Sequence, residues 1–502
     1  MEKPKSIAII GGGIAGLSAG IFGQMNGFST TIYEMNAHPG GVCTSWERQG
    51  YSVNGSIHWL IGSAPGSDIY DMWHQLGVVE GSTIHNHDRF MVFRDIDGMD
   101  VHWYTNLDHL EVHLLEIAPE DEAAIRAFVQ DIRTLSRAKF PMKKSMELFN
   151  VLDYGKFIFG NLPAILAMGK LGQIDLNTYA EKFQSPVLQE VFRSFWTPAM
   201  SVSFIAIQLA FAHNQMAGYP LGGSGAFTQR LQKRYLDLGG QLEVGQKVTR
   251  IRVENDRAVG IELKDNQPVD SDYVVSACDG TTVLDAFLPP EYIPPDVREA
   301  YQILEPFPSL LYFSAGVNRT FTDLPATMTG HSLPLPKTLS AGTYQHQRVA
   351  YQIYNFDPTL APEGKTLITA MIDTDYESWK KVYGAGHDAY QGERQRIAQE
   401  LVAGLEKAFP GISDQIEFMD AATPITYQHW TGNHKGSYEG WLPTPEAQRT
   451  KVPTHFRGLD RFYMSGHWVT PGGGMPPAAY SGRNAIQLIC RNEGQAFRVR
   501  TY

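Results

Sequence analysis

The sequence predicts an α/β fold made of two domains, each assembled from separate parts of the chain. Three observations lead to this prediction. A glycine-rich turn between an apolar strand and a helix lies within the first forty residues, and a second glycine run precedes the last helix, near residue 475. Between these turns, short apolar strands alternate with amphipathic helices. A parallel-sheet domain interrupted by long insertions that form a second domain accounts for this order.

The N-terminal turn has the spacing of a dinucleotide-binding site. Residues 6–10 are expected to form a strand, and Gly11-Gly12-Gly13-Ile14-Ala15-Gly16 follows with the pattern G-x-G-x-x-G. Residues 14–27 carry small and apolar side chains at helical spacing, and the next predicted strand, residues 28–33, leads into Glu34. Strand, glycine turn, helix, strand and acid in this order are the fingerprint of a Rossmann-type domain.

Each residue type in this turn has its own physical reason. The first glycine permits a tight turn, the second lets the backbone approach a pyrophosphate, and the third lets the helix pack close to the sheet. The free N–H groups and the dipole at the helix start attract the diphosphate. The acid accepts hydrogen bonds from ribose hydroxyls. The predicted cofactor-binding residues here are Gly11, Gly13, Ile14, Ala15, Gly16 and Glu34.

A second glycine pair favours FAD over NAD as the cofactor. Gly40 and Gly41 follow the acid closely, so their backbone can approach the same diphosphate from the other side, although an ordinary turn has the same composition. A glycine motif, an acid and then Gly-Gly resembles the amine-oxidase-like and phytoene-desaturase-like flavoproteins. Many members of that family have arginine after the pair, whereas this chain has Val42, so no arginine–phosphate contact is expected.

The C-terminal glycine run is predicted to contact the flavin. Residues 466–477 read GHWVTPGGGMPP, and a helix is expected over 478–490. A glycine run at a helix start exposes N–H donors that can stabilise negative charge on a flavin, although bare phosphate binding is the competing interpretation. The run resembles the carotenoid isomerase-like group, which commonly has glutamine where this chain has His467. This resemblance implies flavin contacts at Gly466, Gly474, Met475 and Pro476, and a backbone contact of Val248 with adenine.

Two histidines are the candidate catalytic residues. His58 lies in the stretch 51–62, which is similar to the segment beside the flavin ring in the carotenoid isomerase and retinol saturase branch. That branch usually has aspartate where this chain has Asn54. A buried structural histidine is an equally good interpretation of His58. His467 places a second titratable group near the ring, so both are candidates for carrying protons.

The resemblance implies a Rossmann-like, glutathione-reductase-like FAD-binding domain with an inserted α+β substrate domain. The FAD-binding domain is expected to comprise residues 1–75, 219–300 and 421–495, and the substrate domain residues 76–218 and 301–420. Residues 332–337 are proline-rich and are predicted to form a loop. Residues 150–172 are predicted to form a pair of helices, buried or covering the domain as a roof, that is broken near Pro163, or alternatively a membrane-docking surface. Tyr427, His429 and Trp430 are candidates for a cavity wall.

Composition excludes several classes of protein. The 502 residues suffice for two or three domains, and 43% hydrophobic and 19% charged residues are ordinary for a globular chain. A formal net charge of -11 argues against nucleic acid as a partner. Three widely separated cysteines predict neither a disulfide framework nor a metal site. With no signal peptide or membrane span recognised, a cytoplasmic protein, soluble or peripheral to the membrane, is expected.

The resemblance implies an FAD-dependent oxidoreductase that acts on C–C bonds of a lipophilic polyene, such as a carotenoid or a related isoprenoid, by desaturation or saturation. Redox-neutral cis–trans or double-bond isomerisation of a carotenoid or an unsaturated fatty acid is the first alternative. A flavin-binding protein that carries or senses a lipid without turnover is the second. An amine oxidase is disfavoured, because no aromatic cage and no cysteine for covalent flavin attachment can be assigned.

Overall fold

A five-stranded parallel sheet forms the centre of the nucleotide-binding region. The computed structural model describes residues 3–139 and 142–501. The sheet has the order β10-β2-β1-β14-β20, and all neighbours are parallel. Its central strand is buried over nearly its whole length, which explains its continuous apolar sequence. The strands are β1 (Ser6–Ile10), β2 (Ser29–Glu34), β10 (Gln241–Val244), β14 (Tyr273–Ser276) and β20 (Phe462–Met464).

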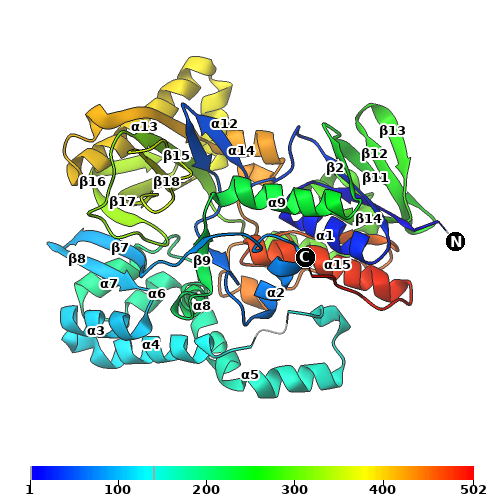
Figure 1. Cartoon of the computed structure of the whole chain (residues 1–502), viewed down its shortest axis with the longest axis horizontal. Coiled ribbons are helices and arrows are strands. Elements are labelled where there is room, and N and C mark those ends of the chain that lie inside the picture. The colour runs from blue at the N-terminus through cyan, green and yellow to red at the C-terminus, as the bar shows by residue number, and fades with distance from the viewer. Residues whose placement is uncertain (1–2, 140–141, 502) are drawn as a thin grey trace.

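Two helices from opposite ends of the chain pack closely against each other beside this sheet (Figure 1). They are α1 (Ile14–Met25) and α15 (Met475–Asn492). A Cβ atom added to Gly482 would lie 2.3 Å from the carbonyl oxygen of Ala15, so only glycine permits this approach. The N-termini of both helices, which carry the two glycine runs, therefore have a fixed relative position. Helix α9 (Gly223–Asp237) also packs on α1.

A seven-stranded sheet forms the centre of the second region of the molecule. Its order is β19-β15-β18-β17-β16-β7-β8. Helices α12 (Tyr376–Gly384) and α13 (His387–Ala408) lie against it, and Leu401 and Leu405 of α13 belong to the core on that face (Figure 1). The predicted α/β class with a nucleotide-binding fold is confirmed, whereas the domain limits stay a prediction. The strands are β7 (Arg89–Ile96), β8 (Met99–Tyr104), β15 (Ser309–Val317), β16 (His331–Ala341), β17 (Tyr344–Ile353), β18 (Thr366–Thr374) and β19 (Ile416–Ala422).

The predicted loop over residues 332–337 is wrong, because these residues belong to strand β16. Proline cannot donate to a strand ladder and is tolerated in strands at edges and irregularities. The ladder with β17 is shifted between Pro334, which pairs with Arg348, and Leu339, which pairs with His346. The prolines therefore lie at an irregularity of the ladder, and β7 pairs with the N-terminal end of β16.

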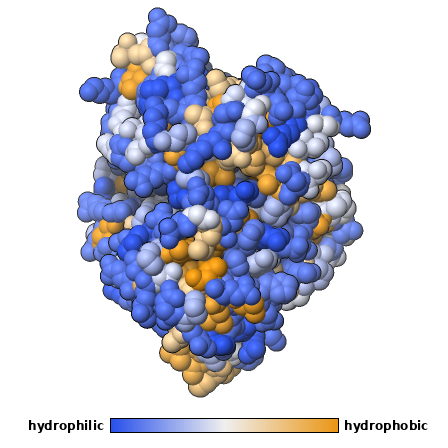
Figure 2. Space-filling model, turned by 90° about the vertical axis from the view of Figure 1, so that its left-hand side faces the viewer, coloured by the Kyte–Doolittle hydropathy of each residue, from blue (hydrophilic) through white to orange (hydrophobic). Residues whose placement is uncertain are grey.

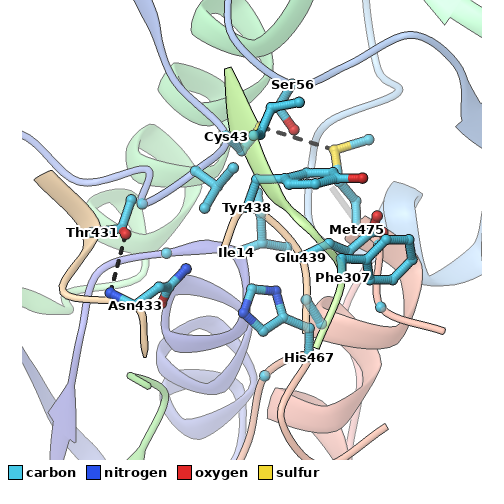
Figure 3. A pocket seen from close by; sticks show the side chains of 18 of the residues that line it. Ile14, Cys43, Ser56, Phe307, Thr431, Asn433, Tyr438, Glu439, His467 and Met475 are labelled. Carbon is cyan, nitrogen blue, oxygen red and sulfur yellow. Dashed lines mark hydrogen bonds between the residues drawn. The ribbon is translucent and has the colours of Figure 1, made fainter. Parts of the chain in front are cut away.

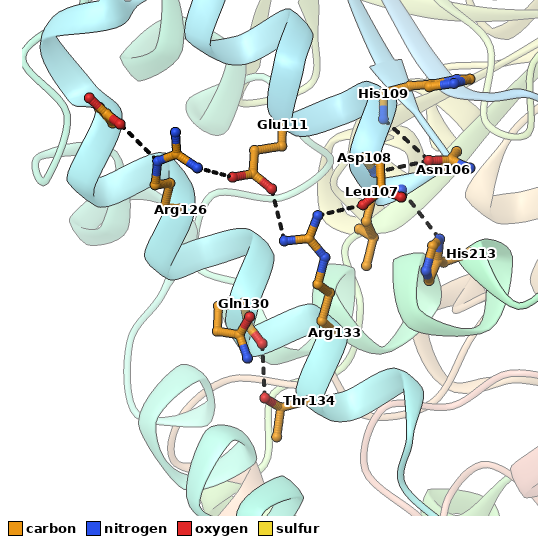
Figure 4. Close-up of polar contacts among 11 residues, drawn as sticks. Asn106, Leu107, Asp108, His109, Glu111, Arg126, Gln130, Arg133, Thr134 and His213 are labelled. Carbon is orange, nitrogen blue, oxygen red and sulfur yellow. Dashed lines mark hydrogen bonds and ion pairs between the residues drawn. The ribbon is translucent and has the colours of Figure 1, made fainter.

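Helices form a separate layer below the seven-stranded sheet (Figure 1). A polar network joins three of them on the outer surface (Figure 4). Arg133 of α4 forms ion pairs with both Asp108 and Glu111 of α3, and His213 of α8 accepts the backbone N–H of Leu107 at 3.3 Å. These contacts fix α8, which lines the cavity described below. The helices are α3 (Leu107–Ile117), α4 (Glu122–Ser136), α5 (Val151–Gly172), α6 (Leu176–Ala180), α7 (Pro186–Arg193) and α8 (Val202–His213).

The expectation of a buried, broken pair of helices over residues 150–172 is wrong in two respects, whereas the alternative of a membrane-docking surface stays a prediction. Helix α5 is a single helix of 22 residues that contains Pro163, and much of its apolar surface is exposed. Val151 is 87% exposed, Phe159 85% and Leu166 65%. Exposure makes the internal proline tolerable, because water can reach the carbonyl group that loses its N–H partner. Among the described helices, none combines the length and apolar character that crossing a membrane requires.

Shorter elements connect these layers. A hairpin of β3 (Ser45–Arg48) and β4 (Tyr51–Asn54) follows the second glycine pair. Strand β9 (Ala217–Pro220) pairs with both β5 (Leu60–Ile61) and β6 (Ile84–His85). A three-stranded antiparallel sheet has the order β11 (Val248–Glu254), β12 (Arg257–Leu263) and β13 (Gln267–Asp270). The three cysteines are free thiols.

Candidate functional site

One cavity of about 970 Å³ connects the two glycine runs with the space between α8 and the seven-stranded sheet. Both candidate catalytic histidines, His58 and His467, line it. Gly16 does not line the cavity, because it packs under the turn, where an added Cβ would lie 1.9 Å from the carbonyl oxygen of Gly11. The other predicted cofactor-binding residues that line it are Gly11, Gly13, Ile14, Ala15, Glu34, Gly40, Gly41, Val248, Gly466, Gly474, Met475 and Pro476.

The N-terminal turn is held by the acid that follows it. One carboxylate oxygen of Glu34 accepts the N–H of Gly12 at 2.8 Å, and the other accepts the N–H of Asn36 at 2.9 Å. The second glycine pair lies beside this turn, because the N–H of Gly40 donates to the carbonyl of Gly12 at 2.9 Å. Two backbone segments without side chains thus face each other at the cavity, as the approach of a diphosphate requires.

The residues present fit a dinucleotide at this end of the cavity. An added Cβ on Gly13 would meet only the Gly40–Gly41 backbone, at 3.9–4.0 Å, so the glycines leave open a cradle that side chains would fill. The N–H groups in the first turn of α1 have no partner within the helix. An anion beside them is favoured by both these donors and the helix dipole.

The C-terminal run presents fewer N–H donors than the sequence interpretation implies. Helix α15 begins at Met475, and Pro476 and Pro477 follow in its first turn. Proline has no N–H, so the donors left at this helix start are those of Gly474 and Met475. Gly473 and Gly474 both have positive φ angles, which hold the run in a conformation that side chains disfavour. The run can therefore direct two N–H groups at a planar ring.

A buried polar network fixes the segment that carries His58. The side-chain oxygen of Asn54 accepts from the N–H of Ser224 at 3.0 Å and from its hydroxyl at 2.6 Å. The Asn54 amide donates to the carbonyl of Ile57 and to the hydroxyl of Tyr354. An aspartate has no N–H to donate, so asparagine suits these acceptors. The departure from the related branch at this position therefore has a structural reason.

The surroundings of His58 and His467 keep both rings neutral. Burial lowers the pKa of each to about 4. The Nε2 atom of His58 is buried and has no hydrogen-bond partner among the described residues. At neutral pH neither ring holds a second proton, and each is a weak base. The role of proton carrier, predicted for both, is therefore disfavoured by their environment.

Sequence reasoning missed Glu439, a carboxyl group in the same part of the cavity (Figure 3). Burial raises its pKa to about 8. Its only sequence signal is a single acid in the aromatic and glycine-rich stretch after α14 (Pro424–Thr431). Of the three candidates for a cavity wall, all of them in α14, Trp430 lines the cavity, whereas Tyr427 and His429 do not.

The rest of the cavity is mainly apolar. Phe204, Ile207 and Phe211 of α8 line one side, and Met371 of β18 lies on the sheet side. The rings of Trp59 and Trp196 add an aromatic wall, with centroids 6.2 Å apart. Polar groups lie on the sheet side of this compartment, where Thr197 donates to Asp373 of β18 at 3.0 Å and Arg348 of β17 donates to backbone carbonyls and the Ser332 hydroxyl. The compartment has the character of a lipophilic tunnel.

The family model for flavin-containing amine oxidoreductases matches residues 14–490, a range that includes both glycine runs except the first residues of the N-terminal turn. The chain belongs to this family. The protein is therefore an FAD-dependent oxidoreductase, as the resemblance predicts. The glycine cradle at one end of the cavity fits this cofactor.

Curated relatives of this flavoprotein cover almost its whole length. It is 24% identical to prolycopene isomerase 1 from an Oncidium hybrid cultivar, over 97% of this chain and 84% of the relative. It is 21% identical to a lycopene-forming phytoene desaturase from Pseudescherichia vulneris, over 97% of this chain and 99% of the desaturase. Cyclohexylamine oxidase from Brevibacterium oxydans has a similar fold, with a TM-score of 0.61 and 14% identity. The match covers 98% of this chain and 100% of the oxidase.

Proposed function

We propose that this flavoprotein changes the oxidation state of C–C bonds in a lipophilic polyene, such as a carotenoid or a related isoprenoid. The observation that carries this proposal is the cavity that joins the glycine cradle to a long apolar compartment between α8 and the seven-stranded sheet. A ligand there lies along aromatic and aliphatic side chains and reaches the end faced by the C-terminal glycine run. The desaturase and isomerase relatives support the same substrate class.

When bound, FAD exchanges a hydride with a substrate carbon, and the protein provides orientation and a dry site. The backbone of Gly13 and Gly41 and the start of α1 would hold the diphosphate, and Glu34 would accept hydrogen bonds from the ribose hydroxyls. The N–H groups of Gly474 and Met475 would stabilise negative charge at the other end of the cofactor. Residues from α8 and Trp59 exclude water from the substrate.

Redox-neutral isomerisation is the second candidate function. The observation that favours it is the slightly higher identity to the prolycopene isomerase than to the phytoene desaturase. Binding of a lipid without turnover is the remaining alternative. The consumption of an electron acceptor or donor separates the first two, and the absence of any product identifies the third.

The test is anaerobic absorbance of the purified holoprotein mixed separately with phytoene, prolycopene, all-trans-retinol and linoleate, followed by product analysis. We expect bleaching of the flavin band at about 450 nm with a more unsaturated product, or reoxidation of the pre-reduced protein with a more saturated one. An isomerised product without net redox change moves the function to isomerase. No product and no redox change with any of these lipids contradicts the proposal.

We also propose that α5 docks on a membrane surface, from which an apolar substrate enters. Figure 2 shows hydrophobic side chains gathered at the lower tip of the molecule, the level at which α5 lies in Figure 1. Helix α5 packs on α8, whose other side lines the cavity. Exposed apolar side chains on a helix are favoured at the boundary between headgroups and acyl chains. A cytoplasmic protein peripheral to the membrane remains our proposal.

The double substitution Phe159→Ser and Leu166→Ser should abolish co-sedimentation with phosphatidylcholine vesicles. Both side chains are largely exposed, so their loss removes apolar surface without opening the core. Val112→Ser on α3 is the matched control, since Val112 is 57% exposed and lies outside α5. Equal sedimentation of the double variant and the wild type would contradict docking through α5. A change of oligomeric state without a change in vesicle binding would assign this face to a second copy of the chain.

A further inference from the structure

A strap of chain that is hydrogen-bonded on both sides holds Glu439 against the C-terminal glycine run. The strap is the segment 437–442, and its backbone is anchored on both sides. The N–H of Phe307 donates to the carbonyl of Gly440 at 3.0 Å, and the N–H of Gly472 donates to the carbonyl of Trp441 at 3.0 Å. The indole N–H of Trp441 donates to the carbonyl of Trp468 at 2.8 Å. The position of the Glu439 side chain is therefore set by the same segment that begins α15.

The carboxyl group of Glu439 faces the start of α15. A Cβ atom added to Gly473 would lie 3.1 Å from Oε1 of Glu439, and one added to Gly474 would lie 3.4 Å from the same oxygen. Gly440 packs on the backbone of His467, where an added Cβ would lie 2.3 Å from the carbonyl oxygen. Glu439, His467 and Met475 consequently surround one part of the cavity (Figure 3).

Nothing in the described part of the chain neutralises this carboxyl group. It forms no hydrogen bond and no ion pair with a described side chain, although it lies in a largely apolar cavity. The titratable groups beside it are the ring of His467 and the hydroxyl of Tyr438, whereas the lysine and the arginine of the cavity lining are Lys247, next to Val248, and Arg348 of β17. A structural carboxylate is normally paired when it is buried. An unpaired carboxyl that points into a site is typical of an acid–base residue.

We propose that Glu439 is a catalytic acid–base residue of this flavin site, whose carboxyl group exchanges a proton with the substrate. The proposal rests on the proposed C–C redox function. Oxidation of a CH–CH unit to C=C removes two hydrogens: one leaves with both electrons as a hydride to FAD, and the other leaves as a proton to the Glu439 carboxylate. Reduction runs the same transfers in reverse, with the carboxylic acid as proton donor. No further reactant is needed within either half-reaction.

The protonation state of Glu439 decides which direction of proton transfer it assists. Because burial raises its pKa to about 8, the group is mainly a neutral acid at pH 7 and mainly a carboxylate above pH 8. Protonation of a C=C bond is therefore favoured below about pH 8, and proton abstraction above it. The two histidines nearby, with pKa values of about 4, do not compete as acids in this range.

The test compares the wild-type holoprotein with Glu439→Gln, Glu439→Asp and the control Glu446→Gln. Glu446 is an exposed glutamate seven positions further along the chain. The first readout is the absorbance spectrum of bound FAD between pH 6 and 10, which needs no substrate. We expect a transition near pH 8 in the wild type and the control, its loss in Glu439→Gln and its displacement in Glu439→Asp.

The second readout is the single-turnover rate with whichever of the four lipids reacts. Glu439→Gln should lower this rate by ~100-fold or more at the pH optimum, as expected for the loss of a general acid or base, and Glu439→Asp should restore part of it. An unchanged spectral transition in Glu439→Gln, or an unchanged rate, overturns the proposal. If no lipid reacts with the wild type, the proposed function fails, and the spectral transition alone decides whether Glu439 titrates at the flavin.

Discussion

Replacing Gly482 by alanine should remove FAD from the protein and lower its free energy of unfolding by about 3 kcal/mol. The added Cβ would lie 2.3 Å from the carbonyl oxygen of Ala15 and 2.9 Å from the backbone nitrogen of Ala19. Both atoms belong to the backbone of α1, so no side chain can rotate away, and α1 and α15 must separate. Because these helices start at the two glycine runs, their separation misplaces both ends of the FAD site.

The matched control is Gly160→Ala in α5. An added Cβ on Gly160 meets no atom within 4 Å, so the same chemical change is expected to stabilise the protein by about 0.5–1 kcal/mol through helix propensity. Urea unfolding gives the free energies, and the ratio of flavin to protein absorbance after gel filtration gives FAD retention. Similar values for the two variants would show that the α1–α15 contact does not govern the site.

The second large effect concerns stability in acid, to which the buried His87 contributes. Its ring is buried, neither ring nitrogen has a partner among the described residues, and burial lowers its pKa to about 3. The unfolded chain has the ordinary pKa, so between pH 6.5 and 3 the unfolded state binds more protons than the folded state. The stability present above pH 6.5 is therefore lost as the pH falls toward 3.

His87→Phe should reduce the loss of unfolding free energy between pH 7.5 and pH 5 by about 2 kcal/mol. The reason is that phenylalanine, unlike histidine, binds no proton when the chain unfolds. Phenylalanine can retain the packing of the ring against His85 and Phe356, whose centroids are 4.7 and 4.6 Å away, and it leaves no polar atom unpaired. Urea unfolding at the two pH values measures the difference. The exposed His429, replaced by phenylalanine, controls for the loss of a histidine as such. If the free energy of unfolding depends on pH equally in His87→Phe and in the wild type, His87 is not a source of the acid sensitivity.

The FAD cradle could be predicted from sequence because its chemistry is local. Gly11 to Gly16 and Glu34 are joined by one helix and one strand, and their spacing alone places the acid beside the turn. The structure adds the hydrogen bond from Gly12 to Glu34, which the order of elements already implies. The second glycine pair follows so closely that it has little freedom to lie elsewhere.

Elements whose partners are distant in sequence were predicted poorly. Residues 332–337 resemble a loop because of their prolines, and they form a strand because β17 and β7 pair on either side. Helix α5 has the composition of a buried segment, but no element within residues 3–139 and 142–501 covers its outer face. Composition reports how apolar a segment is and carries no information about which neighbours reach it.

The sequence by itself determined the family, the FAD-binding turn and the class of fold, since these depend on residue types at fixed short spacings. Only the tertiary structure decided which titratable groups can serve the chemistry. His58 and His467 are obvious candidates in the sequence, yet burial leaves both neutral. Glu439 is inconspicuous there, yet the strap 437–442 brings it into the cavity without a partner. A pKa depends on solvent exclusion and on neighbouring charges, and both arise when segments far apart in the chain pack together.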